Sequence, residues 1–359
     1  MIVGEYFGRP KLTQLAQELK TDPGILEKAV HALALLGHLA ESGLPFVFKG
    51  GTSLLLHLPQ PRRLSIDIDI FCHAAPAELD AVLARIAPRA PFTGFEEQSR
   101  GQRGLPQRRH FKFHYDSPTQ GRPLHILLDV VEEAECPVDL IDKPIRTSFI
   151  EVERELMVRV PTLEALLGDK LTAFAPCTTG VPFRPANGKP CDTMQVVKQL
   201  FDVAELFGAI ADLPAVARAY DAMQALENGY RGGSFTREQT LLDTRDACLA
   251  LAMRDLKGVA RSQEADWLWD GGRRLQSHLI GGRFNLDDAR IATGKIALLC
   301  AVLRRGRLEF APAELRYHHD VETIRPLQIA GDWQALSKLK ATNPEAFFYW
   351  HKASEIEVA

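Results

Sequence analysis

Two neighbouring stretches of the sequence constrain the fold more than any other part. Residues 46–56 read Phe-Val-Phe-Lys-Gly-Gly-Thr-Ser-Leu-Leu-Leu, and residues 63–71 read Arg-Leu-Ser-Ile-Asp-Ile-Asp-Ile-Phe. The pattern predicts an apolar strand, a tight Gly-Gly-Thr-Ser turn, a short helix and a second strand. Because side chains alternate along a strand, we expect Asp67 and Asp69 on one face and the intervening isoleucines on the opposite, buried face.

Two carboxylates on one face repel each other unless a cation lies between them. Mg²⁺ suits such a pair, because it prefers oxygen ligands and keeps several waters while binding substrate phosphates. The turn adds a phosphate site, since glycines let backbone N–H groups approach a phosphate and a helix N-terminus favours negative charge. The predicted phosphate-binding residues are Lys49, Gly50, Gly51, Thr52, Ser53 and Arg63.

A third carboxylate is expected at the same edge of the sheet. Residues 111–115 alternate as a strand, a turn follows, and residues 124–131 return as its partner carrying Asp129. Three carboxylates, Asp67, Asp69 and Asp129, can hold two Mg²⁺ ions that bridge the phosphates of an NTP. Asp129 then lies beside the attacking hydroxyl and can accept its proton. The competing interpretation is an ordinary turn with solvated aspartates, which a buried-looking Ile-Asp-Ile-Asp-Ile run makes less favourable.

The remaining patterns indicate an α+β fold in two parts. A mixed domain with a mixed sheet is expected over residues 1–160, and a helical domain over residues 161–359. Residues 94–109 are expected to form a loop. Helices are predicted at 11–43 with a break at Thr21-Asp-Pro, 76–88, 163–174, 193–207, 211–228, 237–259, 287–304 and 332–340, and a further strand at 156–160.

Charge and cysteine content bear on the binding partners and on the cellular compartment of the protein. The net charge of −3 gives no general attraction to nucleic acid, so RNA binding would need a local basic patch. Arg100, Arg103, Arg108 and Arg109 form one such cluster, which is either a phosphate-backbone contact or a solvated loop. The six cysteines show no Cys-x-x-Cys pairing, and no basic leader or long apolar run is present. We therefore expect a cytoplasmic, monomeric protein that does not enter a membrane.

The motifs resemble those of the AbiEii/AbiGii-type nucleotidyltransferase toxins of bacterial abortive-infection and toxin–antitoxin systems. The resemblance covers about residues 25–210, with Glu27-Lys28, the Lys-Gly-Gly-Thr-Ser-Leu turn and the Arg-Leu-Ser-Ile-Asp-Ile-Asp run as its strongest parts. It also includes Lys170 in Gly-Asp-Lys-Leu-Thr-Ala-Phe and Lys198-Gln-Leu-Phe-Asp202-Val, where Gln199 replaces the usual acid. It implies a DNA polymerase β-like nucleotidyltransferase domain followed by a helical C-terminal domain.

The resemblance further implies a function and partners. The expected activity is transfer of nucleotides from an NTP to an RNA acceptor, with Mg²⁺ or Mn²⁺ and with a tRNA 3′ end as the favoured acceptor. A cognate antitoxin is the expected partner. Lys170 would contact the triphosphate, Asp202 would orient that lysine or help to bind nucleotide, and Lys198 would also be a nucleotide-binding residue. Two alternatives remain: a protein side chain or small molecule as acceptor, or a non-catalytic interaction protein with a vestigial site.

Overall fold

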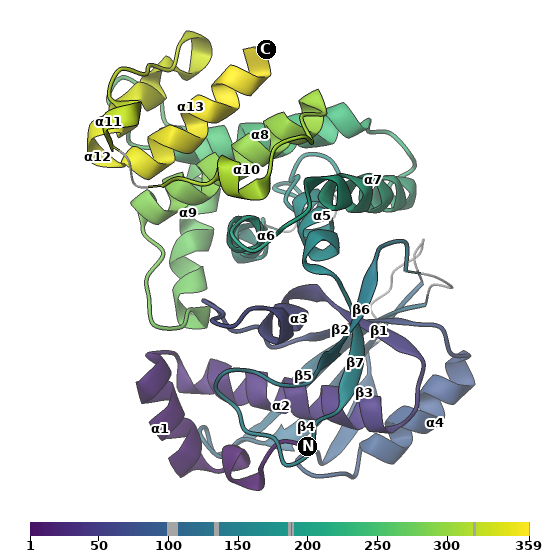
Figure 1. Ribbon diagram of the computed structural model, residues 1–359. Coiled ribbons are helices and arrows are strands. Elements are labelled where there is room, and N and C mark those ends of the chain that lie inside the picture. Colours follow the sequence, from purple (N-terminus) through teal and green to yellow (C-terminus); the bar gives the residue numbers. More distant parts are fainter. Residues whose placement is uncertain (99–106, 133–135, 186–187, 189, 319–320, 359) are drawn as a thin grey trace. The chain divides into compact units, whose positions relative to one another are not determined.

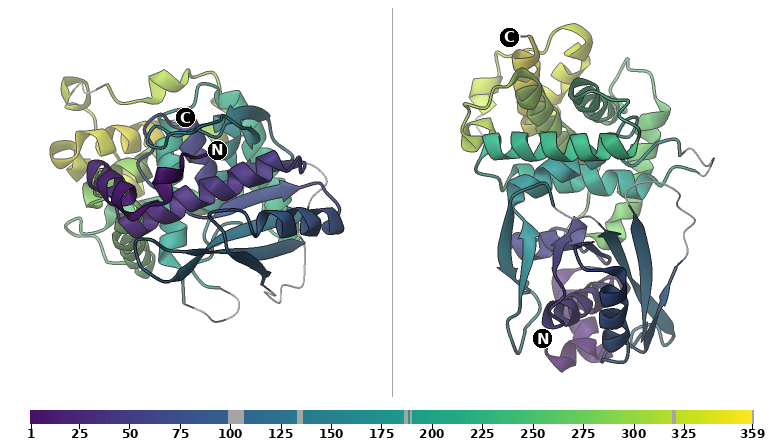
Figure 2. Two further views of the ribbon diagram at one scale, coloured as in Figure 1. Left: turned by 90° about the horizontal axis from the view of Figure 1, so that it is seen from below. Right: turned by 90° about the vertical axis from the view of Figure 1, so that its right-hand side faces the viewer.

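The computed structural model describes residues 1–98, 107–132, 136–185, 188, 190–318 and 321–358. The chain divides into two compact units, which Figures 1 and 2 show in three views. The sheet unit comprises Met1–Thr162 together with Ser277–Arg283, and the helical unit comprises Leu163–Gln276 and Phe284–Ala359. The predicted α+β class is confirmed.

The sheet unit begins with helices whose boundaries follow from local sequence. A 3-10 helix, η1 (Gly4–Phe7), leads into α1 (Arg9–Leu19), and α2 (Pro23–Glu41) follows after the predicted break. The Asp22 side chain accepts hydrogen bonds from the backbone N–H groups of Gly24 and Ile25, which caps the start of α2. Pro23 occupies the first helical position, where its missing N–H costs nothing.

A five-stranded mixed sheet forms the centre of this unit. Its order is β1-β2-β5-β4-β3, with β2 and β5 parallel and the other neighbours antiparallel. The strands are β1 (Phe46–Lys49), β2 (Ile68–Cys72), β3 (Gly94–Glu97), β4 (Arg108–Asp116) and β5 (Pro123–Glu132). Helix α3 (Gly50–His57) follows β1 directly, and α4 (Pro76–Ile86) follows β2.

Three details differ from the sequence-based expectation. Strand β2 begins at Ile68, so Asp67 lies just before the strand, and Ile66 is half-buried where a buried residue was expected. Strand β3 occupies part of the segment expected to be a loop. A separate two-stranded sheet pairs β6 (Leu140–Pro144) with β7 (Met157–Pro161), and β6 was not predicted.

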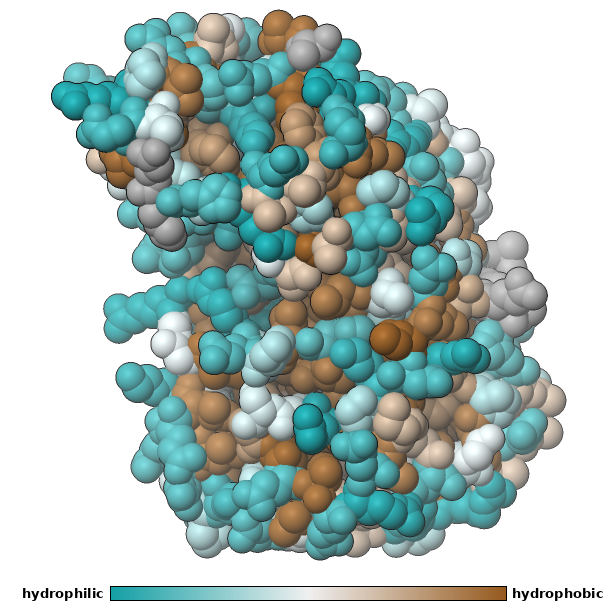
Figure 3. Space-filling model, in the orientation of Figure 1, coloured by the Kyte–Doolittle hydropathy of each residue, from teal (hydrophilic) through white to brown (hydrophobic). Residues whose placement is uncertain are grey.

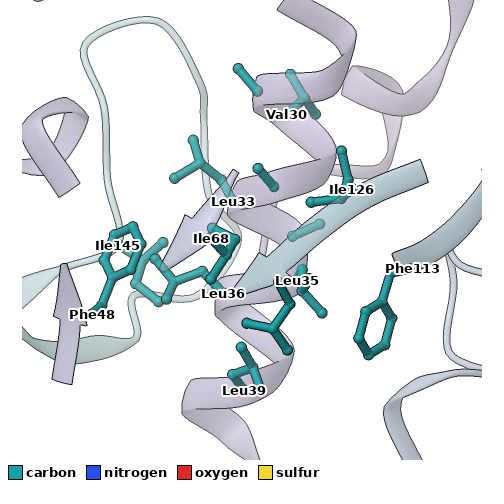
Figure 4. Packing of buried hydrophobic residues seen from close by; sticks show 14 of the residues in the cluster. Val30, Leu33, Leu35, Leu36, Leu39, Phe48, Ile68, Phe113, Ile126 and Ile145 are labelled. Carbon is teal, nitrogen blue, oxygen red and sulfur yellow. The ribbon is translucent and has the colours of Figure 1, made fainter. Parts of the chain in front are cut away.

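The core of the sheet unit lies between the helices and one face of the sheet. Helix α2 packs on β2, β5 and α4. Figure 4 shows leucines of α2, among them Leu33 and Leu36, beside Phe48 and Ile68 of the strands. All four side chains are buried. Each buried side chain of this size contributes about 1.5–3 kcal/mol, so this face fixes the register of the sheet.

A segment distant in sequence completes the sheet unit. Ser277–Arg283 runs beside residues 62–64, the approach to β2. The Leu64 N–H donates to the His278 carbonyl at 2.7 Å, and the Ile280 N–H donates to the Arg62 carbonyl at 2.9 Å. The Thr21 hydroxyl donates to the Leu279 carbonyl at 2.8 Å. This crossing segment therefore ties the start of α2 to the backbone that carries Asp67.

The helical unit contains only helices as regular structure among its described residues. Its helices are α5 (Leu163–Ala173), α6 (Thr193–Phe207), α7 (Leu213–Tyr230), α8 (Arg237–Met253), α9 (Gln263–Leu275), α10 (Leu286–Arg305), η3 (Pro312–Leu315), α11 (Val321–Ile324), η4 (Gly331–Lys338), α12 (Leu339–Thr342) and α13 (Pro344–Val358). A further 3-10 helix, η2 (Gln276–His278), begins at the end of α9 and continues into the crossing segment. Among these helices, α9, α11, α13, η2 and η3 were not predicted. Helix α10 packs against α13, α8 and α6, and α5 packs against α6 and α7.

The surface has the mixed character of a globular protein. On the face in Figure 3, hydrophilic residues cover much of the area, with hydrophobic residues between them. The large hydrophobic side chains that are exposed in the described part of the chain are Ile141, Met157, Val321 and Val358. Within that part, no helix combines the length and apolar character needed to cross a membrane.

The crossing segment gives a first prediction. Leu279 is buried, so Leu279→Ala should lower the stability of the sheet unit by about 2–5 kcal/mol through lost burial and a residual cavity. Hydrogen exchange should show faster exchange of the Leu64 amide, whose acceptor lies on the same segment. Arg283→Ala, at an exposed position of that segment, is the control and should leave this amide protected. Unchanged Leu64 protection in Leu279→Ala would contradict the supporting role.

Candidate active site

Four polar residues form a row across four adjacent strands of the sheet. Lys49 of β1 is opposite Asp69 of β2, Asp69 is opposite Asp129 of β5, and Asp129 is opposite His110 of β4. Directly opposed residues point to the same face of a sheet. The row therefore places two carboxylates side by side, with a lysine at one end and a histidine at the other.

Apolar residues border this row on the same face. Val47, which precedes Lys49 by two residues, forms a small buried cluster with Phe71 and Val131, which follow Asp69 and Asp129 by two residues. The Lys49 ammonium lies 4.1 Å from the centre of the Phe71 ring, a cation–π contact. Nearby apolar groups reduce screening by water, which strengthens both the repulsion between the carboxylates and their attraction to a cation.

Gly50 brings the turn close to the carboxylates. Its φ of +78° lies in the left-handed region, and a Cβ at this position would be only 2.1 Å from Oδ2 of Asp69. A side chain would thus meet both backbone strain and a direct collision. Gly51 is similarly crowded, since its Cβ would lie 2.7 Å from Nη2 of Arg63. The two glycines allow the backbone to pass directly over the carboxylate and the guanidinium.

The hydroxyl groups of the turn have structural partners. Thr52 and Ser53 are fully buried. The Thr52 hydroxyl donates to the Asp67 carbonyl at 2.5 Å, and the Ser53 hydroxyl donates to the Gly50 carbonyl at 2.7 Å. These hydrogen bonds fix the backbone of the turn relative to Asp67. The phosphate-binding role of the two hydroxyls stays a prediction.

Arg63 is also placed differently from a free phosphate ligand. The residue is buried, and its Nη1 donates to the carbonyl of Leu64 at 3.1 Å. Together with the contact against Gly51, this makes Arg63 part of the support beneath the turn.

His110 was missed by the sequence-based reasoning. Its Nδ1 lies 2.7 Å from Oδ1 of Asp129, and its ring is buried. The predicted loop ended at residue 109 and the predicted strand began at Phe111, so His110 was assigned to neither. Extending that strand by a single residue and pairing it with 124–131 would have placed His110 beside Asp129.

A second polar group lies within the helical unit. The Lys170 ammonium of α5 is 3.3 Å from Oδ2 of Asp202 and donates to Oε1 of Gln199 at 3.0 Å, both on α6. Lys170, Lys198 and Asp202 are all buried. Three such polar residues inside an apolar bundle cost free energy unless they are paired, so this cluster is a candidate functional feature. Gln199 is an addition to the predicted set.

The arginine cluster does not form a free basic patch in its described part. Arg109 forms ion pairs of 2.7 Å with Asp80 and with Glu97, and it stacks over the Phe111 ring. Its hydrogen bonds lower the pKa of the Glu97 carboxyl. Arg109 therefore stabilises the helix-covered side of the sheet. Arg108 is exposed, and Arg100 and Arg103 lie outside the described residues.

The donor set of the polar row fits a hard divalent cation. Among the residues that the structure describes, no three His, Cys, Asp or Glu side chains converge into a ready-made metal-binding group. Mg²⁺ does not require one, since it binds through one or two carboxylates plus substrate phosphates and retains waters. Asp69 and Asp129 supply adjacent carboxylates, Asp67 lies two residues before Asp69, and the lack of a side chain at Gly50 lets the backbone of the turn pass close to the Asp69 carboxylate.

Paired carboxylates beside a Gly-Gly turn define the class of protein, an enzyme that handles nucleotide phosphates. The family model described as "Nucleotidyl transferase AbiEii toxin, Type IV TA system" matches residues 34–270, which is more than half of the chain. The chain belongs to this AbiEii family of nucleotidyltransferase toxins from toxin–antitoxin systems, and the predicted resemblance is confirmed.

Solved structures give weaker similarities. A putative nucleotidyltransferase from Helicobacter pylori is 15% identical, with a TM-score of 0.40 and coverage of 81% of this chain and 96% of that one. The JHP933 protein from Helicobacter pylori is 15% identical, with a TM-score of 0.35 and coverage of 70% and 91%. An antigenic nucleotidyltransferase-like protein from Paracoccidioides brasiliensis is 14% identical, with a TM-score of 0.36 and coverage of 58% and 90%.

No curated protein matches the sequence.

The turn gives a second prediction. Gly50→Ala should disrupt nucleotide transfer, because the new methyl group collides with the Asp69 carboxylate. Gly43→Ala is the matched control: Gly43 has a φ of +76° but nothing within 4 Å of its Cβ position. Both variants should lose roughly 1–2 kcal/mol from left-handed strain, measured by urea unfolding, and Gly50→Ala should lose more because its methyl group also collides with Asp69. Only Gly50→Ala should lose activity, and equal activity in the two variants would show that the close approach is unimportant.

The buried pair of the helical unit gives a third prediction. Lys170→Met removes the ammonium from the nearly inaccessible Asp202 carboxylate and should destabilise the unit by about 3–5 kcal/mol. Lys295→Met breaks the more exposed 3.6 Å pair with Glu345 and should cost only about 0–1 kcal/mol.

Tryptophan fluorescence during urea unfolding reports this difference selectively, because all four tryptophans belong to the helical unit. Equal destabilisation by the two substitutions would contradict a special role for the buried pair.

Proposed function

We propose that this protein transfers a nucleotide from an NTP to an RNA acceptor, with the polar row of the sheet unit as its catalytic centre. The observation that carries the proposal is the register of Asp69 and Asp129 on parallel strands, directly beneath the close turn at Gly50. Paired carboxylates next to the N-terminus of α3 suit a substrate that carries both phosphates and divalent cations. Family membership supports the same reaction class.

Asp67, Asp69 and Asp129 would hold Mg²⁺, with Mn²⁺ as an alternative. The metal would neutralise charge on the triphosphate and on the departing pyrophosphate. The backbone at Gly50 and Gly51 would lie along the phosphates, and Lys49 would add positive charge at the end of the row. In this proposal Thr52, Ser53 and Arg63 act indirectly by holding the turn.

The transfer step needs a group that removes a proton from the acceptor. Asp129 is suited to this role, because His110 engages its Oδ1 and the other oxygen is not part of that hydrogen bond. The acceptor oxygen forms a bond to the α-phosphorus, and the bond between that phosphorus and the bridging oxygen of the β-phosphate breaks. The proton passes to Asp129, and pyrophosphate leaves with the electron pair of the broken bond.

The helical unit would contribute to nucleotide binding. Lys170 is proposed to contact the triphosphate, Asp202 to orient that lysine, and Lys198 to support the bound nucleotide. Their burial as a polar cluster supports a specialised role. Functionally, residues 1–160 would supply the metal and phosphate site, and residues 161–359 would complete the nucleotide site.

The acceptor and the partner are drawn from the family resemblance. A tRNA 3′ end is the favoured acceptor, and a cognate antitoxin is the proposed partner that restrains the toxin. We place this activity in the cytoplasm, where NTPs and tRNA are available, and propose that the toxin acts as a monomer. The free cysteines are consistent with a reducing compartment.

Labelled nucleotide tests the proposal. The full-length chain is incubated with α-labelled NTPs, Mg²⁺ and total cellular RNA and protein, and the label is expected in small RNA. Asp69→Asn should reduce transfer by at least about 100-fold. Removing a direct metal ligand should cost more than the roughly 10–100-fold that is typical when a residue hydrogen-bonded to such a ligand is removed. Asp116→Asn, at the exposed far end of β4, is the control and should retain activity.

The distribution of label distinguishes the alternatives. Label found only in protein or only in small molecules would show that RNA is not the acceptor, but it would still support nucleotide transfer. If the folded protein transferred nucleotide to none of these classes of acceptor, the catalytic proposal would be contradicted.

A further inference from the structure

His110 occupies the end of the polar row, at the one place where Asp129 meets a side chain from β4. Its ring Nδ1 is 2.7 Å from Oδ1 of Asp129. The histidine side chain is 8% exposed, and the aspartate side chain is 31% exposed. His110 is therefore fixed in the protein interior, while Asp129 reaches the accessible face of the sheet.

The backbone holds His110 on both sides. It is directly opposite Asp129 in the antiparallel pairing of β4 with β5. On its other side, the His110 carbonyl accepts a hydrogen bond of 2.7 Å from the N–H of Gln98. Both contacts are part of the extended sheet, so the position of the imidazole is set by strand register.

The surroundings of Nε2, the second ring nitrogen of His110, indicate which ring nitrogen carries the proton. Nε2 of His110 is buried and finds no hydrogen-bond partner among the described residues. A buried N–H without a partner is costly, so a proton is better placed on Nδ1, where it faces the carboxylate. The hydrogen bond then runs from Nδ1–H of His110 to Oδ1 of Asp129.

We propose that His110 is a positioning residue that orients the Asp129 carboxylate for metal binding and proton acceptance. This inference rests on the proposed function. A carboxylate on a strand can rotate about its terminal bond, and a fixed donor on one oxygen limits that rotation. His110 thus holds Oδ1 and directs Oδ2 toward the reaction.

Another histidine on the same strand provides a matched comparison. His114 lies four residues further along β4 and therefore shares the face of His110. It is opposite His125 and lies 3.8 Å from Glu96, away from the polar row. Removing His114 changes the same residue type on the same strand face without touching Asp129.

The experiment measures metal binding and catalysis separately in the full-length protein. Mn²⁺ binding is followed by electron paramagnetic resonance without NTP, and kcat and KM are measured with labelled NTP. His110→Ala should weaken Mn²⁺ binding and lower kcat by about 10–100-fold, with little change in KM for the NTP. His110→Asn should restore much of both, because its amide N–H₂ can donate from nearly the same place as Nδ1. His114→Ala should match the wild type.

The outcomes separate this role from simple packing. Equal losses in His110→Ala and His110→Asn would show that the ring only fills space, and unchanged Mn²⁺ binding in His110→Ala would also overturn the proposal. If the wild type transferred no nucleotide but bound Mn²⁺, the proposed function would fail while the binding comparison still tested His110. A wild type that did not bind Mn²⁺ at all would contradict both.

Discussion

The repulsion between Asp69 and Asp129 is the constraint on which the site depends. Two carboxylates in register on neighbouring strands are unfavourable unless nearby groups compensate for their charge. The structure surrounds the pair with Lys49 at one end of the row, His110 at the other, and Gly50 above Asp69. We propose that this arrangement binds a cation together with the phosphates of a nucleotide, which would connect the sheet to nucleotide transfer.

Two parts of the structure support the strands that carry Asp69 and Asp129. Beneath the sheet, α2 and α4 bury its apolar face and so fix which residues point toward the site. At the approach to β2, the segment Ser277–Arg283 hydrogen-bonds to residues 62–64. The sheet unit is therefore completed by residues that follow α9, and it is not a simple N-terminal module.

Much of this arrangement could be predicted from the sequence, and the failures have physical reasons. Alternation and glycine spacing identified Gly50, Asp69 and the strand of Asp129, because these signals are local. The roles of Thr52 and His110 depend on hydrogen-bond partners from other elements, which local patterns do not specify. Helix α9 was missed because it contains paired glycines and many charges, and the crossing segment has no periodicity to detect.

The most direct test of the central claim is the position of a bound metal. A crystal of the full-length protein grown with Mn²⁺ and a non-hydrolysable NTP analogue would show the ion by anomalous scattering. The account predicts a peak between the carboxylates of Asp69 and Asp129, at roughly 2.0–2.2 Å from their oxygens, with the triphosphate along the Gly50–Gly51 backbone. Metal and nucleotide bound elsewhere, with both carboxylates left unliganded, would contradict it.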